Sequence, residues 1–304
     1  MTPNRRFRAL PARTAETSGL VLLILPFLVG MAALVVVPAV VTLGLSTFRY
    51  DLIQPPSFVG LDNFRALLAD DIFGIAVRNS ILFLAFAVPI RLIAVVGLAL
   101  LLHRSSMRGG ALYRLAIFLP VVIPEVALAI AWLWILNPLF GPLNSILTGL
   151  GVAPVAWLTD PGAAQAAMLL IACFTIGEAF VIAVAARRSI PADLYDMAVV
   201  DGASSPALVR FVTLPLMLPV LVLLVLRDAV LVLQATLVPS LIVTGGGPPP
   251  YATTYGPLFI YEQAFEYLRY GYAAAATALF LGVTIVIVLL QVRVLRRWGH
   301  WTWA

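Results

Sequence analysis

The chain has 304 residues, of which 62% are hydrophobic and only 11% are charged. With a mean hydropathy of +1.05 it has too few polar residues to cover a soluble domain of this length, so lipid must be the solvent for much of its surface. The net charge is +5, and the charged residues lie mainly between apolar runs, which argues against nucleic-acid binding. All 19 basic residues are arginine, which excludes a lysine-containing phosphate-binding loop for ATP in this chain.

Six apolar runs follow one another along the chain, each of the ~20 residues that cross ~30 Å of hydrocarbon. They occupy residues 19–45, 81–102, 116–136, 163–186, 215–238 and 273–294. Arginines precede the first run, as in a signal peptide, but its apolar stretch is too long and no clear cleavage site follows. The sequence therefore predicts an all-α integral membrane protein with about six transmembrane helices, the first of them a retained anchor.

The distribution of arginine between the runs predicts the orientation of the chain. If the N-terminus is cytoplasmic, thirteen arginines lie inside and four lie outside. The inside set is Arg5, Arg6, Arg8, Arg13, Arg104, Arg108, Arg114, Arg187, Arg188, Arg210, Arg293, Arg296 and Arg297, and the outside set is Arg49, Arg65, Arg78 and Arg269. Both termini are then cytoplasmic, with an N-terminal segment over 1–18, a membrane domain over 19–294 and a tail over 295–304.

Three segments predicted to lie outside are long enough to carry structure, namely 46–80, 137–161 and 239–272. Each mixes aromatic residues with Gly and Pro, and so either packs at the membrane interface or forms a docking surface for an external partner. Residues 245–247, all glycine, predict a tight turn. The single cysteine, Cys173, lies in an apolar run, so an intrachain disulfide is excluded and no metal cluster is indicated.

The longest predicted cytoplasmic segment between two spans is 187–214, and its first half has the pattern of a short helix. Ser189 can cap this helix, with Pro191 in its opening turn and Asp193 at the positive end of the helix dipole. One face then carries Leu194, Met197, Ala198 and Asp201 at helical spacing.

Gly202 breaks this first helix, and Ser205 with Pro206 begins a second one that Pro215 is expected to end at the membrane. A small helix with an Ala/Met face beside a glycine hinge would form a rigid knob suited to a groove in another protein. The alternative is a loop that lies on lipid headgroups.

The same segment resembles the EAA loop of importer permeases of the ABC superfamily, whose usual pattern is roughly I-P-x-E-L-x-E-A-A-x-x-D-G-A followed by T-L-P and a further proline. The matching residues are Ile190, Pro191, Leu194, Ala198, Asp201, Gly202, Ala203, Thr213, Leu214, Pro215 and Pro219. Asp193 and Asp196 stand where Glu is usual, and Met197 stands where the first Ala is usual. Aspartate keeps the charge with a shorter reach, and methionine enlarges an apolar knob.

Further motifs resemble the carbohydrate-type permeases of this superfamily. They are Phe58-Val-Gly-Leu-Asp-Asn-Phe64, Leu119-Pro120, Asn137-Pro138, Gly141-Pro-Leu-Asn144, Thr244-Gly-Gly-Gly-Pro248, Ala264-Phe265 and Gly271-Tyr-Ala-Ala274. Each motif is weak alone, but their order and spacing together are specific to this family.

The resemblance implies a type I ABC importer permease fold and a bacterial inner-membrane location. It implies four kinds of partner: a second homologous permease subunit, two copies of a cytoplasmic ABC ATPase, an extracytoplasmic solute-binding protein and membrane lipid. ATP and Mg²⁺ would be bound by the ATPase, so this chain needs no cofactor. The coupling residues implied are Asp196, Met197, Ala198, Asp201, Gly202 and Ala203.

Five charged residues fall inside predicted spans, where exposure to lipid would cost each ~2.5–3.5 kcal/mol. They are Arg91, Glu125, Glu178, Arg227 and Asp228. Similar depth in their spans permits Arg91 or Arg227 to pair with Glu125, whereas the adjacent Arg227 and Asp228 point ~100° apart and cannot face one another.

These charges either fix helix packing as ion pairs or line a polar translocation path, in which Arg91 and Arg227 would suit an anionic or polyhydroxy solute. Four aromatic residues are candidates for stacking on sugar rings, although such residues more often pack spans. They are Trp132, Trp134, Phe174 and Phe180.

Two other classes of protein stay open. An autonomous secondary transporter would use the intramembrane charges as an ion relay. A membrane enzyme is disfavoured because only His103 and His300 offer imidazole chemistry, and both lie near predicted cytoplasmic ends. Within the ABC permeases, the motifs also fit importers of glycerol phosphate or its diesters, and nothing in the sequence selects among these solutes.

Overall fold

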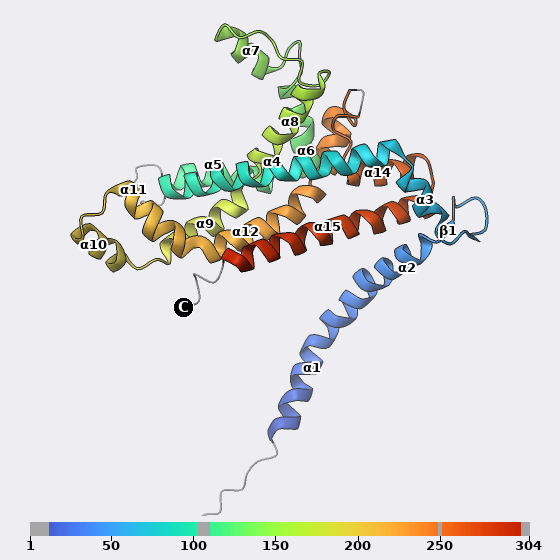
Figure 1. Cartoon of the computed structure of the whole chain (residues 1–304), viewed down its shortest axis with the longest axis horizontal. Coiled ribbons are helices and arrows are strands. Elements are labelled where there is room, and N and C mark those ends of the chain that lie inside the picture. Colours follow the sequence, from blue (N-terminus) through green and yellow to red (C-terminus); the bar gives the residue numbers. More distant parts are fainter. Residues whose placement is uncertain (1–11, 103–109, 249–250, 299–304) are drawn as a thin grey trace, which may run out of the picture.

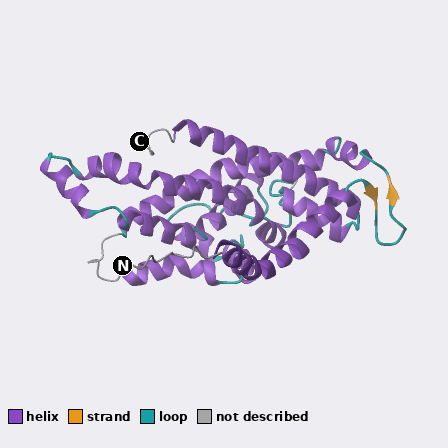
Figure 2. Ribbon diagram, turned by 90° about the horizontal axis from the view of Figure 1, so that it is seen from below, coloured by secondary structure: helices purple, strands orange, loops and turns teal. Residues whose placement is uncertain are grey.

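A computed structural model describes residues 12–102, 110–248 and 251–298 of the chain. Figure 1 shows long helices lying side by side, with a second group of helices rising from their middle and the N-terminal helix standing apart. Viewed at 90° to this, the two short strands lie at one end of the bundle and the α10–α11 connection at the other (Figure 2).

The first half of the chain contains α1 (Ala12–Met31), the π-helical turn η1 (Ala32–Val36), α2 (Val37–Leu45), β1 (Phe48–Arg49), β2 (Ser57–Phe58), α3 (Asp62–Leu68), α4 (Asp71–Leu101), α5 (Gly110–Val122), α6 (Glu125–Ile135) and α7 (Pro142–Gly149). The second half contains α8 (Pro161–Phe174), α9 (Gly177–Arg188), α10 (Ala192–Val200), α11 (Ser205–Leu208), η2 (Val209–Thr213), α12 (Leu214–Gln234), α13 (Leu237–Pro239), η3 (Ser240–Thr244), α14 (Gly256–Tyr261), η4 (Glu262–Glu266) and α15 (Tyr270–Trp298). The two strands pair antiparallel, with Phe48 opposite Phe58.

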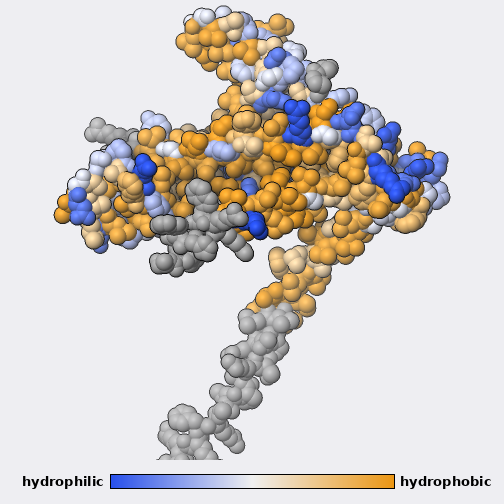
Figure 3. Space-filling model, in the orientation of Figure 1, coloured by the Kyte–Doolittle hydropathy of each residue, from blue (hydrophilic) through white to orange (hydrophobic). Residues whose placement is uncertain are grey.

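The predicted membrane-spanning architecture is confirmed. Within the described residues, four helices are long and apolar enough to cross a membrane, and the number rises to six when each of two bent helix pairs counts as one span. Apolar side chains cover most of the visible surface, and polar ones gather mainly toward the end that carries β1 and α3 (Figure 3). The orientation of the termini stays a prediction, because residues 1–11 and 299–304 lie outside the described residues.

Spans three and four are not the straight helices that their apolar runs suggested. α5 and α6 meet at 105°, and α8 and α9 meet at 48°. The first break falls before Pro124, which has no N–H to continue a helix and occupies the N-cap of α6. At the second break, a Cβ on Gly177 would lie 2.6 Å from the carbonyl oxygen of Ile117, so only glycine lets α9 approach α5 this closely.

The second span begins ten residues earlier than its apolar run, at Asp71. Polar residues in its first turns hide this part of the helix from a hydropathy search. Asp70 caps it, because its Oδ1 accepts hydrogen bonds from the backbone of Ile72 and Phe73. The other carboxylate oxygen accepts a hydrogen bond of 2.7 Å from Tyr272, so one side chain joins the starts of α4 and α15.

The first span lies almost free of the rest of the bundle. Its helix covers Leu22–Leu45, and none of the candidate window is buried. Its far end, α2, comes close to α15 and β1. A helix that is apolar all round and unburied must be surrounded by lipid or pack against another protein.

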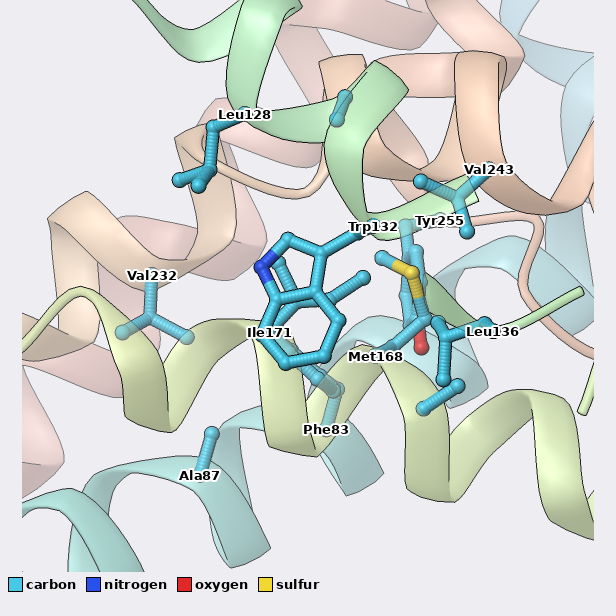
Figure 4. Close-up of a cluster of buried hydrophobic side chains, with 12 residues drawn as sticks. Phe83, Ala87, Leu128, Trp132, Leu136, Met168, Ile171, Val232, Val243 and Tyr255 are labelled. Atoms are coloured by element: carbon cyan, nitrogen blue, oxygen red, sulfur yellow. The ribbon is translucent and has the colours of Figure 1, made fainter. Parts of the chain in front are cut away.

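One buried core lies where α4, α6 and α8 meet α12 and the segment after it (Figure 4). Phe83 and Tyr255 are in aromatic contact there, with 5.1 Å between ring centroids. Trp132 and Met168 complete the centre of the cluster, at 7% and 2% exposure. This core fixes α6 against α4 and α8.

Two asparagines of the motifs that resemble the permease family hold loops in place. Asn63 donates to the carbonyls of Ser46 and Phe48. Asn144 accepts from the backbone of Val155 at 3.1 Å and from the indole of Trp157 at 2.9 Å. Their side-chain amides form hydrogen bonds with polar groups of loops that have no partner strand or helix to bond with.

The three glycines after span five form the predicted tight turn. Gly245, Gly246 and Gly247 all have positive φ, at 55°, 81° and 85°. The middle glycine, Gly246, is buried, and polar contacts hold the turn, since Thr254 Oγ1 donates to the carbonyl of Gly246 and Asn79 donates to the carbonyl of Thr254.

Candidate functional site

Helix α10 forms the tip of the α9–α12 connection, within the segment predicted to couple the chain to an ATPase. Asp193 lies in its first turn, as expected, but the expected cap is wrong. Ser189 donates to the carbonyl of Ala186 at 2.8 Å and thus closes the end of α9. Pro191 occupies the N-cap of α10, so Ser189 is too far from its first turn to cap it.

The apolar face of α10 is exposed. The helix has no buried residue, and Met197 and Val200 are 64% and 88% exposed. Asp196 is also exposed, while Ala198 is half-buried. An isolated nine-residue helix is marginal in water, so an apolar surface of this kind is suited to a partner groove.

The predicted break at Gly202 is confirmed, and its geometry is a Schellman cap. Gly202 has φ of +83° and donates to Val199, while the next residue, Ala203, donates to Ala198 at 2.9 Å. Asp201 is the C-cap residue between them. The glycine is needed for its left-handed backbone, because nothing lies within 4 Å of where a Cβ would be.

Three side chains together hold α10 in place, and the central one, Tyr195, was not singled out by the sequence. The hydroxyl of Tyr195 lies 2.9 Å from the hydroxyl of Thr213, which is fully buried. The guanidinium of Arg187 lies over the Tyr195 ring, 4.3 Å from its centroid. Tyr195 therefore ties α10 to the end of α9 and to the start of span five.

The second helix of the loop does not end at Pro215. One helical stretch runs from Ser205 through η2 into α12, and Ser204 is its N-cap. Leu214 donates to Val209 across the π-helical turn, and Pro215 follows as the second residue of α12, where a missing N–H is tolerated. The second half of the loop and span five are therefore one continuous helix.

A cavity of about 260 Å³ lies among α4, α5, α6, α8, α9 and α12, and we call it the charged cavity. All five charged residues predicted inside the spans line it, namely Arg91, Glu125, Glu178, Arg227 and Asp228. The structure thus brings into one place residues that are spread over more than 130 positions of the sequence.

The buried ion pair of the charged cavity joins α4 to α12. Arg91 Nε donates to Asp228 Oδ2 at 3.0 Å, and both side chains are less than 10% exposed. Arg91 also donates to the carbonyl of Ala172 and to Thr175 Oγ1, at the break between α8 and α9. The second carboxylate oxygen of Asp228, Oδ1, is buried without a partner among the described residues.

The pairing of Arg91 or Arg227 with Glu125, which similar depth permits, is not formed among the described residues. Arg227 instead forms an ion pair with Glu178 on α9. Because the chain turns by 105° just before α6, Glu125 starts a new helix and does not lie ten residues deep in a straight one. The prediction that Arg227 and Asp228 cannot face each other is confirmed, since their partners lie on α9 and α4.

Glu125 is the one charged residue of the cavity without an ion pair in the described part of the chain. Its side chain is accessible, and its place in the first turn of α6 puts it at the positive end of the helix dipole.

The four candidate aromatic residues lie in different surroundings. Phe180 is fully buried in the core and Trp134 is 57% exposed, and neither lines the cavity. Trp132 packs edge-on against Phe174, with 5.4 Å between the ring centroids. The indole Nε1 of Trp132 has no partner among the described residues.

Comparison with known proteins places this geometry in a family. Residues 101–300 match the family described as binding-protein-dependent transport system inner membrane component. The trehalose/maltose transport system permease protein of Thermococcus litoralis is 32% identical, over 88% of this chain and 89% of the relative.

The diacetylchitobiose uptake system permease protein of Streptomyces coelicolor is 31% identical, over 80% of this chain and 72% of the relative. Among solved structures, a chain of a bacterial alginate ABC transporter in complex with an alginate pentasaccharide-bound periplasmic protein has the same fold. Its TM-score is 0.81 at 22% identity, and the match covers 94% of this chain and 96% of that chain.

Proposed function

The chain belongs to the family of binding-protein-dependent transport system inner membrane components, and we propose that it moves a sugar or sugar-like solute inward as one permease subunit of an ATP-driven importer. It is a permease subunit of the inner membrane and not an enzyme. The sugar class is supported by relatives named for trehalose/maltose and diacetylchitobiose. In this proposal, ATP and Mg²⁺ are bound by a separate ATPase.

The observation that carries the proposal is the exposed apolar face of α10. Met197 and Val200 project from a helix that has no buried residue of its own. A cleft on the ATPase would bury this face, with Asp196 and Asp201 at its rim. Apolar anchors surrounded by polar groups are the usual arrangement of a protein interface.

Coupling would follow from the rigidity of the connection. Because α11, η2 and α12 form one helical stretch, and Tyr195 of α10 contacts Thr213 within it, a movement of α10 would be passed on to span five and the charged cavity. Arg227 and Asp228 lie on the same stretch. Closure of two ATPase subunits on ATP would then tilt span five and alternate access to the cavity by rigid-body motion.

Two further partners complete the proposed importer. The unburied first span supports a second permease subunit, because a helix this exposed can pack against the surface of a neighbour. A solute-binding protein would dock on the segments predicted to lie outside, of which 46–80 carries β1 and α3 at the end of the bundle opposite α10 (Figure 1).

The test combines purification with cross-linking. The tagged chain, purified from native membranes, should bring down an ABC ATPase, a second permease and a binding protein, and the reconstituted complex should take up solute only with ATP. With Cys173→Ser as background, Val200→Cys should cross-link to the ATPase. Leu139→Cys, at a position 92% exposed and far from α10 in the chain, is the matched control and should not.

Uptake driven by an ion gradient without ATP would support a secondary transporter instead. Absence of any ATPase from the purified material would contradict the proposal as a whole.

A further inference from the structure

The charges of the charged cavity leave no cation free for an anionic solute. Of its five charged residues, the two arginines are each paired with a carboxylate. With three carboxylates and two guanidinium groups, the formal charge of the cavity is −1. The residue that carries the excess charge is Glu125.

The hydrogen-bonding groups of the cavity show the same bias. Arg91 uses Nε on Asp228, Nη1 on Ala172 and Thr175, and Nη2 on the carbonyl of Thr175 at 3.5 Å. Arg227 donates its Nη2 to Glu178. Among the described residues, the one buried side-chain atom of the cavity that has no partner is an acceptor, Asp228 Oδ1, and the Glu125 carboxylate forms no ion pair.

Asp228 Oδ1 is significant because the whole residue is only 5% exposed. Buried polar atoms almost always have a partner, and an unpaired one needs an explanation. Since Asp228 lines the cavity, a donor of a bound solute is a partner that fits.

On these observations, which rest on the proposed function, we propose that the charged cavity selects neutral, hydroxyl-rich solutes and rejects anionic ones. Glu125 is the specificity-determining residue, with Asp228 as a second acceptor. Solute hydroxyls donate to both carboxylates in short, charge-assisted hydrogen bonds. A phosphate or carboxylate would enter a site that is already negative and would find no unpaired cation.

The apolar walls of the cavity suit the C–H face of a sugar ring, as its carboxylates suit the hydroxyls. Phe83, Leu128, Met168 and Ile171 line it on the side of the core, and Figure 4 shows these side chains gathered there. Apolar side chains pack against the C–H faces of a sugar ring, which a small polar anion lacks. At about 260 Å³ the cavity is smaller than the ~300–1,000 Å³ of most ligand pockets, so the second permease subunit would enlarge it.

The test begins with the solute that the native importer carries. Heating the binding protein that co-purifies with this chain releases its solute, which mass spectrometry identifies. The released solute is then supplied in labelled form for ATP-dependent uptake by the reconstituted complex. We expect a neutral sugar or polyol, and we expect glycerol 3-phosphate to be taken up at least tenfold more slowly.

Variants then test Glu125 itself. Glu125→Gln removes the charge at constant size and should lower the kcat/KM of uptake at least tenfold, whereas Glu125→Asp keeps the carboxylate and should restore most of it. Thr284→Val, which removes a polar group of α15 outside the cavity, is the control and should leave uptake unchanged.

An anionic native solute with intact ATP-dependent uptake would overturn this inference and leave the proposed function standing. Undiminished uptake by Glu125→Gln would overturn the role of Glu125. Loss of ATP-dependent uptake of the released solute by the wild-type complex would overturn both.

Discussion

In the charged cavity, nearly every charged side chain finds its partner within the chain, whereas on α10 the apolar side chains find none. The cavity pairs Arg91 with Asp228 and Arg227 with Glu178, across helices far apart in the sequence. The helix α10 has no buried residue. Both arginines of the cavity are therefore paired within the isolated chain, while α10 depends on its neighbours and on a partner for stability. Substitutions in the cavity should affect folding, and substitutions on α10 should affect coupling.

The largest effect is expected from Asp228→Ala. It leaves the Arg91 guanidinium buried and unpaired, which costs ~3–5 kcal/mol of folding free energy. Unfolding of the purified protein in detergent, followed by tryptophan fluorescence, measures the loss. A matched double variant, Arg91→Leu with Asp228→Leu, removes both charges and should recover most of the stability. If Asp228→Ala is as stable as the wild type, the pair does not stabilise the cavity.

Met197→Glu should separate the two regions most clearly. A charge on the exposed face of α10 should change stability by less than ~0.5 kcal/mol, because Met197 has no buried contacts to lose. It should lower ATP-driven uptake tenfold or more, because an unpaired charge buried at the ATPase interface weakens binding. Each ~1.4 kcal/mol of binding free energy that is lost lowers the affinity tenfold. Met197→Leu, which keeps the apolar knob, should retain uptake. Normal uptake by Met197→Glu would remove α10 from the coupling interface.

Gly202→Ala tests whether α10 depends on its glycine cap. A side chain at φ of +83° costs ~1–2 kcal/mol, although the space around it is open. Amide hydrogen exchange over α10 should become ~5–30 times faster, because opening is favoured by that free energy. Gly202→Asn, which tolerates the left-handed region better, should have a smaller effect. Equal exchange in all three proteins would mean that the cap does not limit opening.

The smallest effect is expected at the link between α10 and span five. Tyr195→Phe removes the hydroxyl that meets Thr213 but keeps the ring beneath Arg187. A double-mutant cycle with Thr213→Val should give a coupling energy of ~0.5–1.5 kcal/mol. Tyr251→Phe, at a half-exposed tyrosine outside this contact, is the control. A coupling energy near zero would show that the cation–π contact alone holds the helix.

The sequence predicted the parts of the candidate site that depend on local chemistry. Gly202 breaks α10 because a left-handed residue is needed within a single turn, and the pattern around it is visible over a few residues. The expectation that Ser189 caps α10 is wrong for a reason that is equally local. A serine between two helices suits the end of one as well as the start of the next, and the hydrogen bond to Ala186 decides it.

The pairing of the intramembrane charges could not be predicted in the same way. Arg91 and Asp228 are 137 positions apart, and the choice of partner depends on how far each helix is rotated and bent. Depth along straight spans favoured Glu125, but the 105° turn before α6 moves it out of line. The unpaired oxygen of Asp228 has no sequence signal at all.

By itself, the sequence determined that this chain lies in a membrane, how many times its apolar runs can cross it, and which loop carries an exposed apolar helix. Hydrophobic length, arginine placement and glycine position act over one helix or one turn, so they can be followed along the chain. Only the tertiary structure decided that span five continues unbroken from the loop, that spans three and four are bent, and that five distant charges share one cavity with a single unpaired carboxylate. These features arise from the packing of helices against one another, and packing joins residues that the sequence keeps apart.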